Sequence, residues 1–146
     1  MSGQATTRPT LSSVQVGDPL PELRRTVGQD QISAYAAAAG DPNPIHTDEE
    51  FAKSVGFPST IAHGMLSMAI AAECVARWAG GYDSVASLAV RFSKPLLRGD
   101  TIICSGRVTE IDTDAGLVHI ELEAVGDRGD RVLTNGRASV RLAAGG

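Results

Sequence analysis

Aromatic residues and cysteines are both scarce in this sequence. The chain has one Trp, two Tyr and three Phe among its 146 residues, so its core has to be built from Ala, Val, Ile and Leu. Its two cysteines, Cys74 and Cys104, form neither a CxxC motif nor a Cys/His pair with metal-ligand spacing. This spacing argues against a zinc site and a disulfide framework, and it favours a reduced, cytoplasmic setting.

Long apolar segments and runs of positive charge are missing as well. The longest apolar stretch, residues 61–72, is shorter than the roughly 20 residues that span a bilayer. The polar first ten residues do not resemble a secretory signal. Thirteen Lys and Arg residues against seventeen Asp and Glu residues give a net charge of −4. We therefore expect neither a nucleic acid nor a membrane as a partner.

What the sequence does contain fits one folded domain. A chain of this length is the size of a single domain, and 42% apolar with 21% charged residues is a globular composition. We take residues 1–11 as a flexible N-terminal lead-in and residues 12–143 as the domain.

Helical patterns fill the first half of the chain. Asp30 is a candidate N-cap for a helix over residues 31–39. Thr47 opens a capping-box sequence that predicts a short second helix. A third helix over residues 61–79 is apolar on nearly every side, so it has to be surrounded by protein.

Alternating apolar and polar residues, which are typical of strands with one buried face, fill the second half. A short edge strand is also predicted at residues 22–27, because the prolines before it exclude a central position. The later predicted strands cover residues 88–93, 101–111, 118–124 and 132–142. A mostly antiparallel sheet that follows one very apolar helix indicates an α+β fold in which the sheet wraps the helix.

The segment after the first helix carries the clearest chemical signal. Pro42 and Pro44 each fix a φ angle, so this loop would hold Asp41 and His46 in defined positions. A carboxylate and an imidazole held close together can activate a water molecule. The residues alone also allow a purely structural interpretation, in which Asp41 forms an Asx turn and His46 only precedes a helix cap.

His46 also departs from a local rule. It stands just before the predicted cap Thr47, where an apolar residue usually packs against one such as Phe51. A polar, titratable side chain at that position favours a functional role, because local rules are broken most often at functional sites.

A second candidate lies at the beginning of the apolar helix, at His63 and Gly64. The first turn of a helix offers free N–H groups and the positive end of the helix dipole. Gly64 would let a carbonyl oxygen approach its N–H closely, as in an oxyanion site. Alternatively, Gly64 only permits tight packing. We interpret His63 as a core histidine with satisfied hydrogen bonds rather than a catalytic one.

These motifs resemble a known family. The segment from Tyr35 to His46, with the core Gly-Asp-Pro-Asn-Pro-Ile-His, resembles the hydratase signature of the MaoC-like dehydratases, and Ile-Ala-His-Gly-Met at residues 61–65 resembles its continuation. The resemblance covers roughly residues 12–142. It implies a hot-dog fold, a curved antiparallel sheet around one long helix. It also implies reversible addition of water to a trans-2-enoyl thioester of CoA or acyl carrier protein, with no metal or other cofactor.

The resemblance also assigns roles to individual residues. It makes Asp41 and His46 the catalytic pair and Gly64 the oxyanion donor. Four further residues are candidates for substrate binding or loop ordering: Asn43, Pro44, His63 and Met65. Because the family works as dimers, it implies a homodimer or a heterodimer with a second hot-dog subunit.

Other functions occur on the same fold. A hot-dog thioesterase would place its carboxylate on the long helix, where the sequence offers only Glu73, more than two turns from the start. The chain could also be one subunit of a heterodimeric dehydratase, or a non-catalytic acyl-thioester-binding protein. The intact pair of Asp41 and His46 favours the enzyme.

Overall fold

The computed structural model describes residues 8–145, and these form five strands and three α-helices. In chain order the elements are β1 (Leu23–Thr26), α1 (Gln29–Ala39), α2 (Glu49–Ser54), α3 (Gly64–Ala79), β2 (Val85–Phe92), β3 (Thr101–Asp112), β4 (Leu117–Gly126) and β5 (Arg131–Arg141). Short 3-10 helices lie at Leu11–Ser13, Pro44–His46 and Tyr82–Ser84. No helix in this range has the length and hydrophobicity needed to cross a bilayer.

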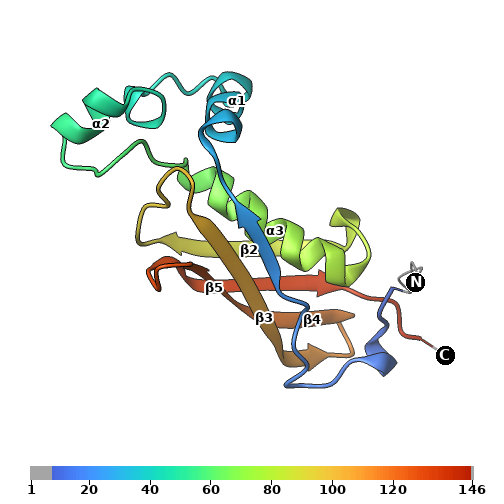
Figure 1. Cartoon of the computed structure of the whole chain (residues 1–146). Coiled ribbons are helices and arrows are strands. Elements are labelled where there is room, and N and C mark those ends of the chain that lie inside the picture. Colours follow the sequence, from blue (N-terminus) through green and yellow to red (C-terminus); the bar gives the residue numbers. More distant parts are fainter. Residues whose placement is uncertain (1–7, 146) are drawn as a thin grey trace, which may run out of the picture.

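The strands form one antiparallel sheet in the order β1-β3-β4-β5-β2, and α3 runs across one face of it (Figure 1). The alternation in β4 explains this packing. Val118 and Ile120 face inward and are buried with Val75 and Ala79 of α3, whereas the polar residues between them face the other way. The predicted α+β arrangement of a sheet around an apolar helix is therefore confirmed.

The strand predictions agree with the structure to within a few residues. β1 lies at one edge of the sheet, as the preceding prolines predicted. Turns at residues 113–116 and 127–130 join β3 to β4 and β4 to β5.

The predicted start of each helix was wrong. α1 begins at Gln29 after Gly28, and Asp30 lies in its first turn without capping it. α2 is capped by Asp48, whose Oδ1 accepts the N–H of Phe51 at 3.1 Å. Thr47 cannot take that role because it ends the 3-10 helix Pro44–His46. The position just before the cap is therefore Thr47 and not His46. The predicted departure of His46 from the local rule was wrong for that reason.

The third helix begins later than predicted, at Gly64 rather than residue 61. Its expected first residues are extended because they pair with another segment of the chain. Ile61 forms a bridge with Leu97, and the N–H of Ala62 donates to the carbonyl of Leu96 at 2.8 Å. This pairing fixes His63 at the N-cap position of α3.

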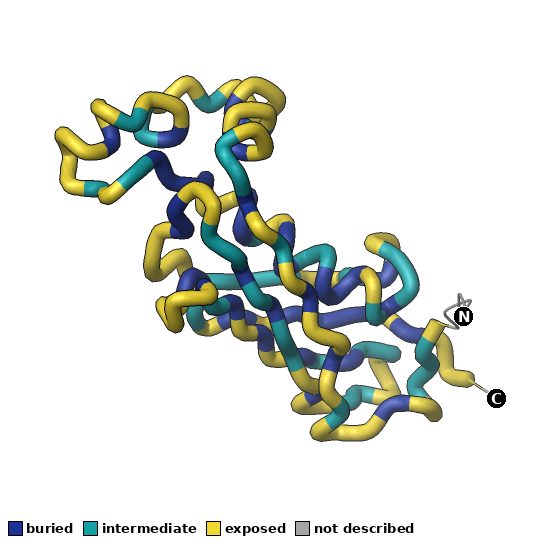
Figure 2. Tube along the Cα trace, in the orientation of Figure 1, coloured by how far each residue is buried: buried dark blue, intermediate teal, exposed yellow. Residues whose placement is uncertain are grey.

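The segment that carries the candidate residues lies at one end of the molecule. Figure 1 shows α1 and α2 beyond the end of the sheet where α3 begins, with the two ends of the described range 8–145 at the opposite end. Figure 2 shows mostly exposed residues along α1 and α2, whereas buried residues recur along α3 and the central strands between exposed ones. Of the predicted lead-in, residues 1–7 lie outside the described range. Leu11 donates its N–H to the carbonyl of Ala143 at 2.8 Å, and the boundary at residue 12 stays a prediction.

Candidate active site

The loop after α1 is ordered by its own side chains and prolines. Asn43 donates its N–H to Oδ1 of Asp41 at 3.1 Å, and its own Oδ1 accepts the N–H of Ile45 at 3.2 Å. Pro44 opens the 3-10 helix that ends at His46, where its fixed φ suits a first helical position. Asn43 and Pro44 therefore set the path of the chain between Asp41 and His46.

His46 is buried, and its ring is held by a backbone carbonyl. Nδ1 lies 2.8 Å from the carbonyl oxygen of Ile61. A carbonyl only accepts hydrogen bonds, so Nδ1 carries the proton and Nε2 of the neutral ring has a free lone pair. The side chain of Gln29 also donates to the backbone carbonyl of His46 at 2.9 Å. The bridging segment and α1 together thus fix the orientation of this imidazole.

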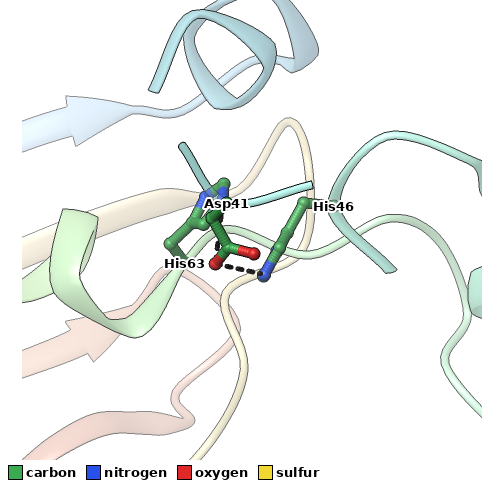
Figure 3. A group of neighbouring side chains, drawn as sticks. All are labelled: Asp41, His46 and His63. Carbon is green, nitrogen blue, oxygen red and sulfur yellow. Dashed lines mark ion pairs between the residues drawn. The ribbon is translucent and has the colours of Figure 1, made fainter. Parts of the chain in front are cut away.

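The carboxylate of Asp41 faces two imidazoles rather than one. Its Oδ2 lies 3.8 Å from Nε2 of His46 and 3.7 Å from Nε2 of His63 (Figure 3). Both separations are longer than a direct hydrogen bond. Groups at such a separation can act on one water molecule between them. The side chain of Asp41 is 43% exposed, so this end of the site is open to solvent.

The expectation that His63 is a satisfied core histidine was wrong. The residue is 4% exposed, and neither ring nitrogen has a hydrogen-bond partner within the described part of the chain. Its ring stacks on His46 with centroids 3.6 Å apart and packs tilted against Tyr35 at 4.8 Å. Burial lowers the pKa of His63, and His46 lowers it further, while Asp41 raises it. The environment thus favours the neutral ring.

The three side chains have the donor types of a metal site but not the geometry of one. Asp41, His46 and His63 offer ligand atoms within 4.8 Å of one another. However, imidazole lone pairs lie in the ring planes, and the two rings are stacked with their centroids 3.6 Å apart and an angle of only 20° between their planes. One ion cannot lie in both planes at bonding distance. The absence of a metal stays a prediction, and this stacking supports it.

A mostly apolar cavity of about 500 Å³ adjoins the pair. His46, Gly64 and Met65 line it, together with Phe92 and Val132 from the sheet. Asp41, Asn43, Pro44 and His63 are not among its lining residues. The cavity therefore meets the predicted site at His46 and at the first turn of α3.

Gly64 is the first residue of α3, so its N–H has no acceptor within the helix. A side chain at this position would crowd the cavity wall, because a Cβ on Gly64 would lie 3.0 Å from the ring of Phe92. Glycine thus leaves this N–H accessible beside an aromatic ring that is 52% exposed. The arrangement suits the binding of a carbonyl oxygen at the helix N-terminus.

A larger hollow of about 790 Å³ lies elsewhere, and it includes none of the candidate residues. It covers the sheet face opposite α3, where Glu121, Asn135 and Arg137 give it a polar lining. An acyl chain requires apolar walls, so the smaller cavity is the better candidate for a thioester substrate.

Sequence reasoning missed three contributors to the site. Phe92 was expected in a strand and within the family resemblance, but its place beside Gly64 in the cavity wall was not; an aromatic residue just before a polar turn is a weak signal of such a role. Gln29 and the carbonyl of Ile61 orient His46 from distant segments, and no local pattern could have revealed either contact.

Comparison with known proteins extends this picture. A 3-hydroxyacyl-thioester dehydratase X of Mycobacterium tuberculosis is 40% identical over 89 residues, which cover 61% of this chain and 30% of that protein. An (R)-specific enoyl-CoA hydratase of Rhodospirillum rubrum is 29% identical over 125 residues, 85% of each chain. The solved R-hydratase PhaJ1 of Pseudomonas aeruginosa has a TM-score of 0.83 at 26% identity, covering 93% of this chain and 86% of that one.

This likeness in structure confirms the predicted hot-dog fold. The chain spans less than a third of the length of the Mycobacterium tuberculosis relative, whereas it covers most of the two hydratases. Residues 13–125, well over half of the sequence, match the MaoC like domain. The chain therefore belongs to the MaoC-like dehydratase family.

Proposed function

We propose that this chain is an (R)-specific enoyl-thioester hydratase, which in the reverse direction dehydrates 3-hydroxyacyl thioesters. Its substrate would be a trans-2-enoyl group on CoA or on acyl carrier protein. The observation that carries the proposal is the position of His46, which faces the carboxylate of Asp41 and also lines the apolar cavity. The relatives named above carry the same reaction class in their names.

The pair can act on one water molecule. As the water oxygen bonds to C3 of the enoyl group, the pair accepts a proton from the water. The electrons of the C2–C3 double bond move toward the thioester oxygen, and C2 then takes a proton from the pair. Atoms balance as the addition of one H₂O, and the pair returns to its starting protonation. The lone pair on Nε2 equips His46 as a base, but a close carboxylate–imidazole pair titrates as a unit.

The thioester oxygen gains negative charge during this step. The N–H of Gly64, at the positive end of the α3 dipole, is suited to stabilise that charge. One such donor is worth about 3 kcal/mol of barrier in comparable sites. Gly64 would thus accelerate the reaction without itself exchanging a proton.

We also propose that a second hot-dog subunit covers this end of the molecule. Phe51, Met65 and Phe92 are large apolar residues with 40%, 54% and 52% exposure, respectively. Met65 and Phe92 line the cavity, and β2 is an edge strand of the sheet. A partner would bury this surface and complete the cavity wall. It would be a second copy of this chain or a different hot-dog chain.

A thioesterase based on Glu73 is the weaker candidate. Glu73 forms ion pairs with Arg25 and with Arg77, and it does not line the cavity that contains His46. A carboxylate neutralised by two guanidinium groups and turned away from the cavity is poorly placed to attack a thioester or to activate water.

An absorbance assay tests the proposed reaction. Purified protein is mixed with crotonyl-CoA and, separately, with a long-chain trans-2-enoyl-CoA, and the loss of enoyl absorbance is followed. We expect loss with the wild type and with Asp114→Asn, an exposed control in the β3–β4 turn, but not with Asp41→Asn. Equal rates in wild type and Asp41→Asn would contradict the assignment. If neither CoA substrate loses its enoyl absorbance, the assay is repeated with a trans-2-enoyl group on acyl carrier protein. No loss of absorbance there either would contradict a stand-alone hydratase.

A further inference from the structure

His63 has no part in the reaction described above, yet its surroundings are unusual. It is almost fully buried, and both ring nitrogens lack hydrogen-bond partners in the described residues. Buried polar atoms without partners are costly, so they are rare in folded proteins. One of these nitrogens, Nε2, lies 3.7 Å from the same Asp41 oxygen that faces His46.

The tautomer of His46 leaves the carboxylate without a donor on that side. Because Nδ1 of His46 donates to Ile61, the lone pair of Nε2 faces Oδ2 of Asp41. A lone pair and an anionic oxygen repel each other, so this pair needs a donor from elsewhere to hold the carboxylate in place. The Asn43 N–H contacts the other carboxylate oxygen. The nitrogen of His63 is the remaining group aimed at Oδ2.

The charge state of His63 is set by its neighbours. The titratable side chains that contact its ring are Asp41, His46 and Tyr35. Two imidazoles stacked at 3.6 Å cannot both carry a positive charge in a buried site. Burial opposes the charged form as well, and Asp41 alone favours it. A neutral ring with one N–H is therefore the form that this environment supports.

We propose that His63 is a positioning residue whose neutral Nε2–H donates to Oδ2 of Asp41 and holds the carboxylate toward His46. The inference rests on the hydratase function proposed above. A small rotation of the half-exposed Asp41 side chain would close the 3.7 Å separation, as often happens when a catalytic site binds its substrate. The two histidines then hold opposite tautomers. One offers a lone pair and the other offers a proton to the same carboxylate.

Nuclear magnetic resonance of the ring nitrogens tests the tautomer without any substrate. The chain has only three histidines, and loss of signals in His63→Gln and His119→Gln assigns them. We expect His63 to be neutral with its proton on Nε2 and His46 to carry its proton on Nδ1. We also expect His63 to resist protonation below the ordinary histidine pKa of about 6.5, because burial and His46 lower its pKa. A proton on Nδ1 of His63, or a charged ring at neutral pH, would overturn the proposal.

Two variants test the effect on catalysis. His63→Gln keeps an N–H near the position of Nε2, whereas His63→Leu keeps bulk without a donor. We expect His63→Leu to lower kcat at least tenfold with little change in KM, and His63→Gln to recover much of that loss. The acid limb of the plot of kcat against pH should move to higher pH in His63→Leu only. A hydrogen-bond donor to a carboxylate favours its charged form, and only the Leu variant loses that donor.

The outcomes separate the two proposals. Equal losses in both variants, with an unchanged acid limb, would mean that His63 only fills space, and this would overturn the inference. If wild-type protein fails to hydrate any enoyl thioester, the proposed function fails. In that case the nuclear magnetic resonance experiment, which needs no substrate, still tests whether His63 carries the Nε2 proton that would bond to Asp41.

Discussion

The rings of His46 and His63 stack face to face, with centroids 3.6 Å apart and an angle of 20° between their planes. The sequence separates them by seventeen residues, yet both direct Nε2 at one oxygen of Asp41. The stack allows at most one positive charge and disfavours a shared metal ion. This arrangement suits the proposed proton transfer on a neutral or singly charged pair, which is the chemistry that water addition needs.

Removal of either member of the pair should abolish most activity while the fold remains. We expect Asp41→Asn and His46→Ala to lower kcat/KM by about 10²-fold or more, the usual range for a lost general acid or base. Enoyl absorbance measures the rate, and circular dichroism checks the fold. Asp114→Asn serves as the matched control. Wild-type turnover in either variant would remove that residue from the mechanism and overturn the assignment of the pair.

A methyl group at Gly64 should interfere with the thioester oxygen. Its Cβ would lie 3.0 Å from the Phe92 ring, a contact that the half-exposed ring can relieve by moving at a cost of about 1 kcal/mol. We expect Gly64→Ala to lower kcat/KM more than tenfold. Adding Phe92→Ala should restore stability in urea without restoring the rate. Recovery of the rate in the double variant would place the defect in packing rather than at the N–H.

The depressed pKa of His63 should make stability depend on pH. The unfolded chain takes up the proton near the ordinary histidine pKa of about 6.5, whereas the folded chain resists it because the ring is buried. Stability should therefore fall as pH drops below about 6.5 and continue to fall until the folded form is also protonated. We expect the free energy of unfolding, measured with urea, to fall less with decreasing pH in His63→Gln than in wild type. An identical fall in wild type and His63→Gln would contradict this account.

Both cysteines should resist thiol reagents while the protein is folded. Burial raises the pKa of Cys74 and raises that of Cys104 to about 12, so the reactive thiolate is nearly absent at neutral pH. We expect no reaction with a disulfide reagent in native buffer and two equivalents in denaturant. Rapid labelling of the native protein would show that the packing between α3 and β3 is open.

Light scattering should find a dimer or a larger assembly. The proposed second subunit would cover the exposed apolar residues around the cavity and the edge strand β2. A monomer with full hydratase activity would contradict the proposed partner. A monomer without activity that gains it on addition of a second hot-dog chain would identify a heterodimer.

The sequence by itself determined the class of fold. Alternation of apolar and polar residues from residue 88 onward is a local property, and it predicted the strands of the sheet to within a few residues. The apolar character of residues 61–79 likewise required a buried helix, which the structure has over Gly64–Ala79. Prolines at 42 and 44 predicted a loop between the first two helices, and the structure has one there, because prolines restrict φ whatever the rest of the chain does. Helix starts were less predictable, since Asp48 and the Ile61–Leu97 bridge compete with the local signals.

The relation among the site residues was decided only by the tertiary structure. The pattern around Asp41 and His46 indicated a catalytic pair. His63, in contrast, was expected to be a core histidine with satisfied hydrogen bonds. A pattern along the chain cannot show that a residue at the start of α3 stacks on a residue of the preceding loop. The tautomer of His46 likewise depends on a carbonyl that the bridge of Ile61 to Leu97 brings into place. Residue types set which chemistry is available, and long-range packing set the distances that make it usable.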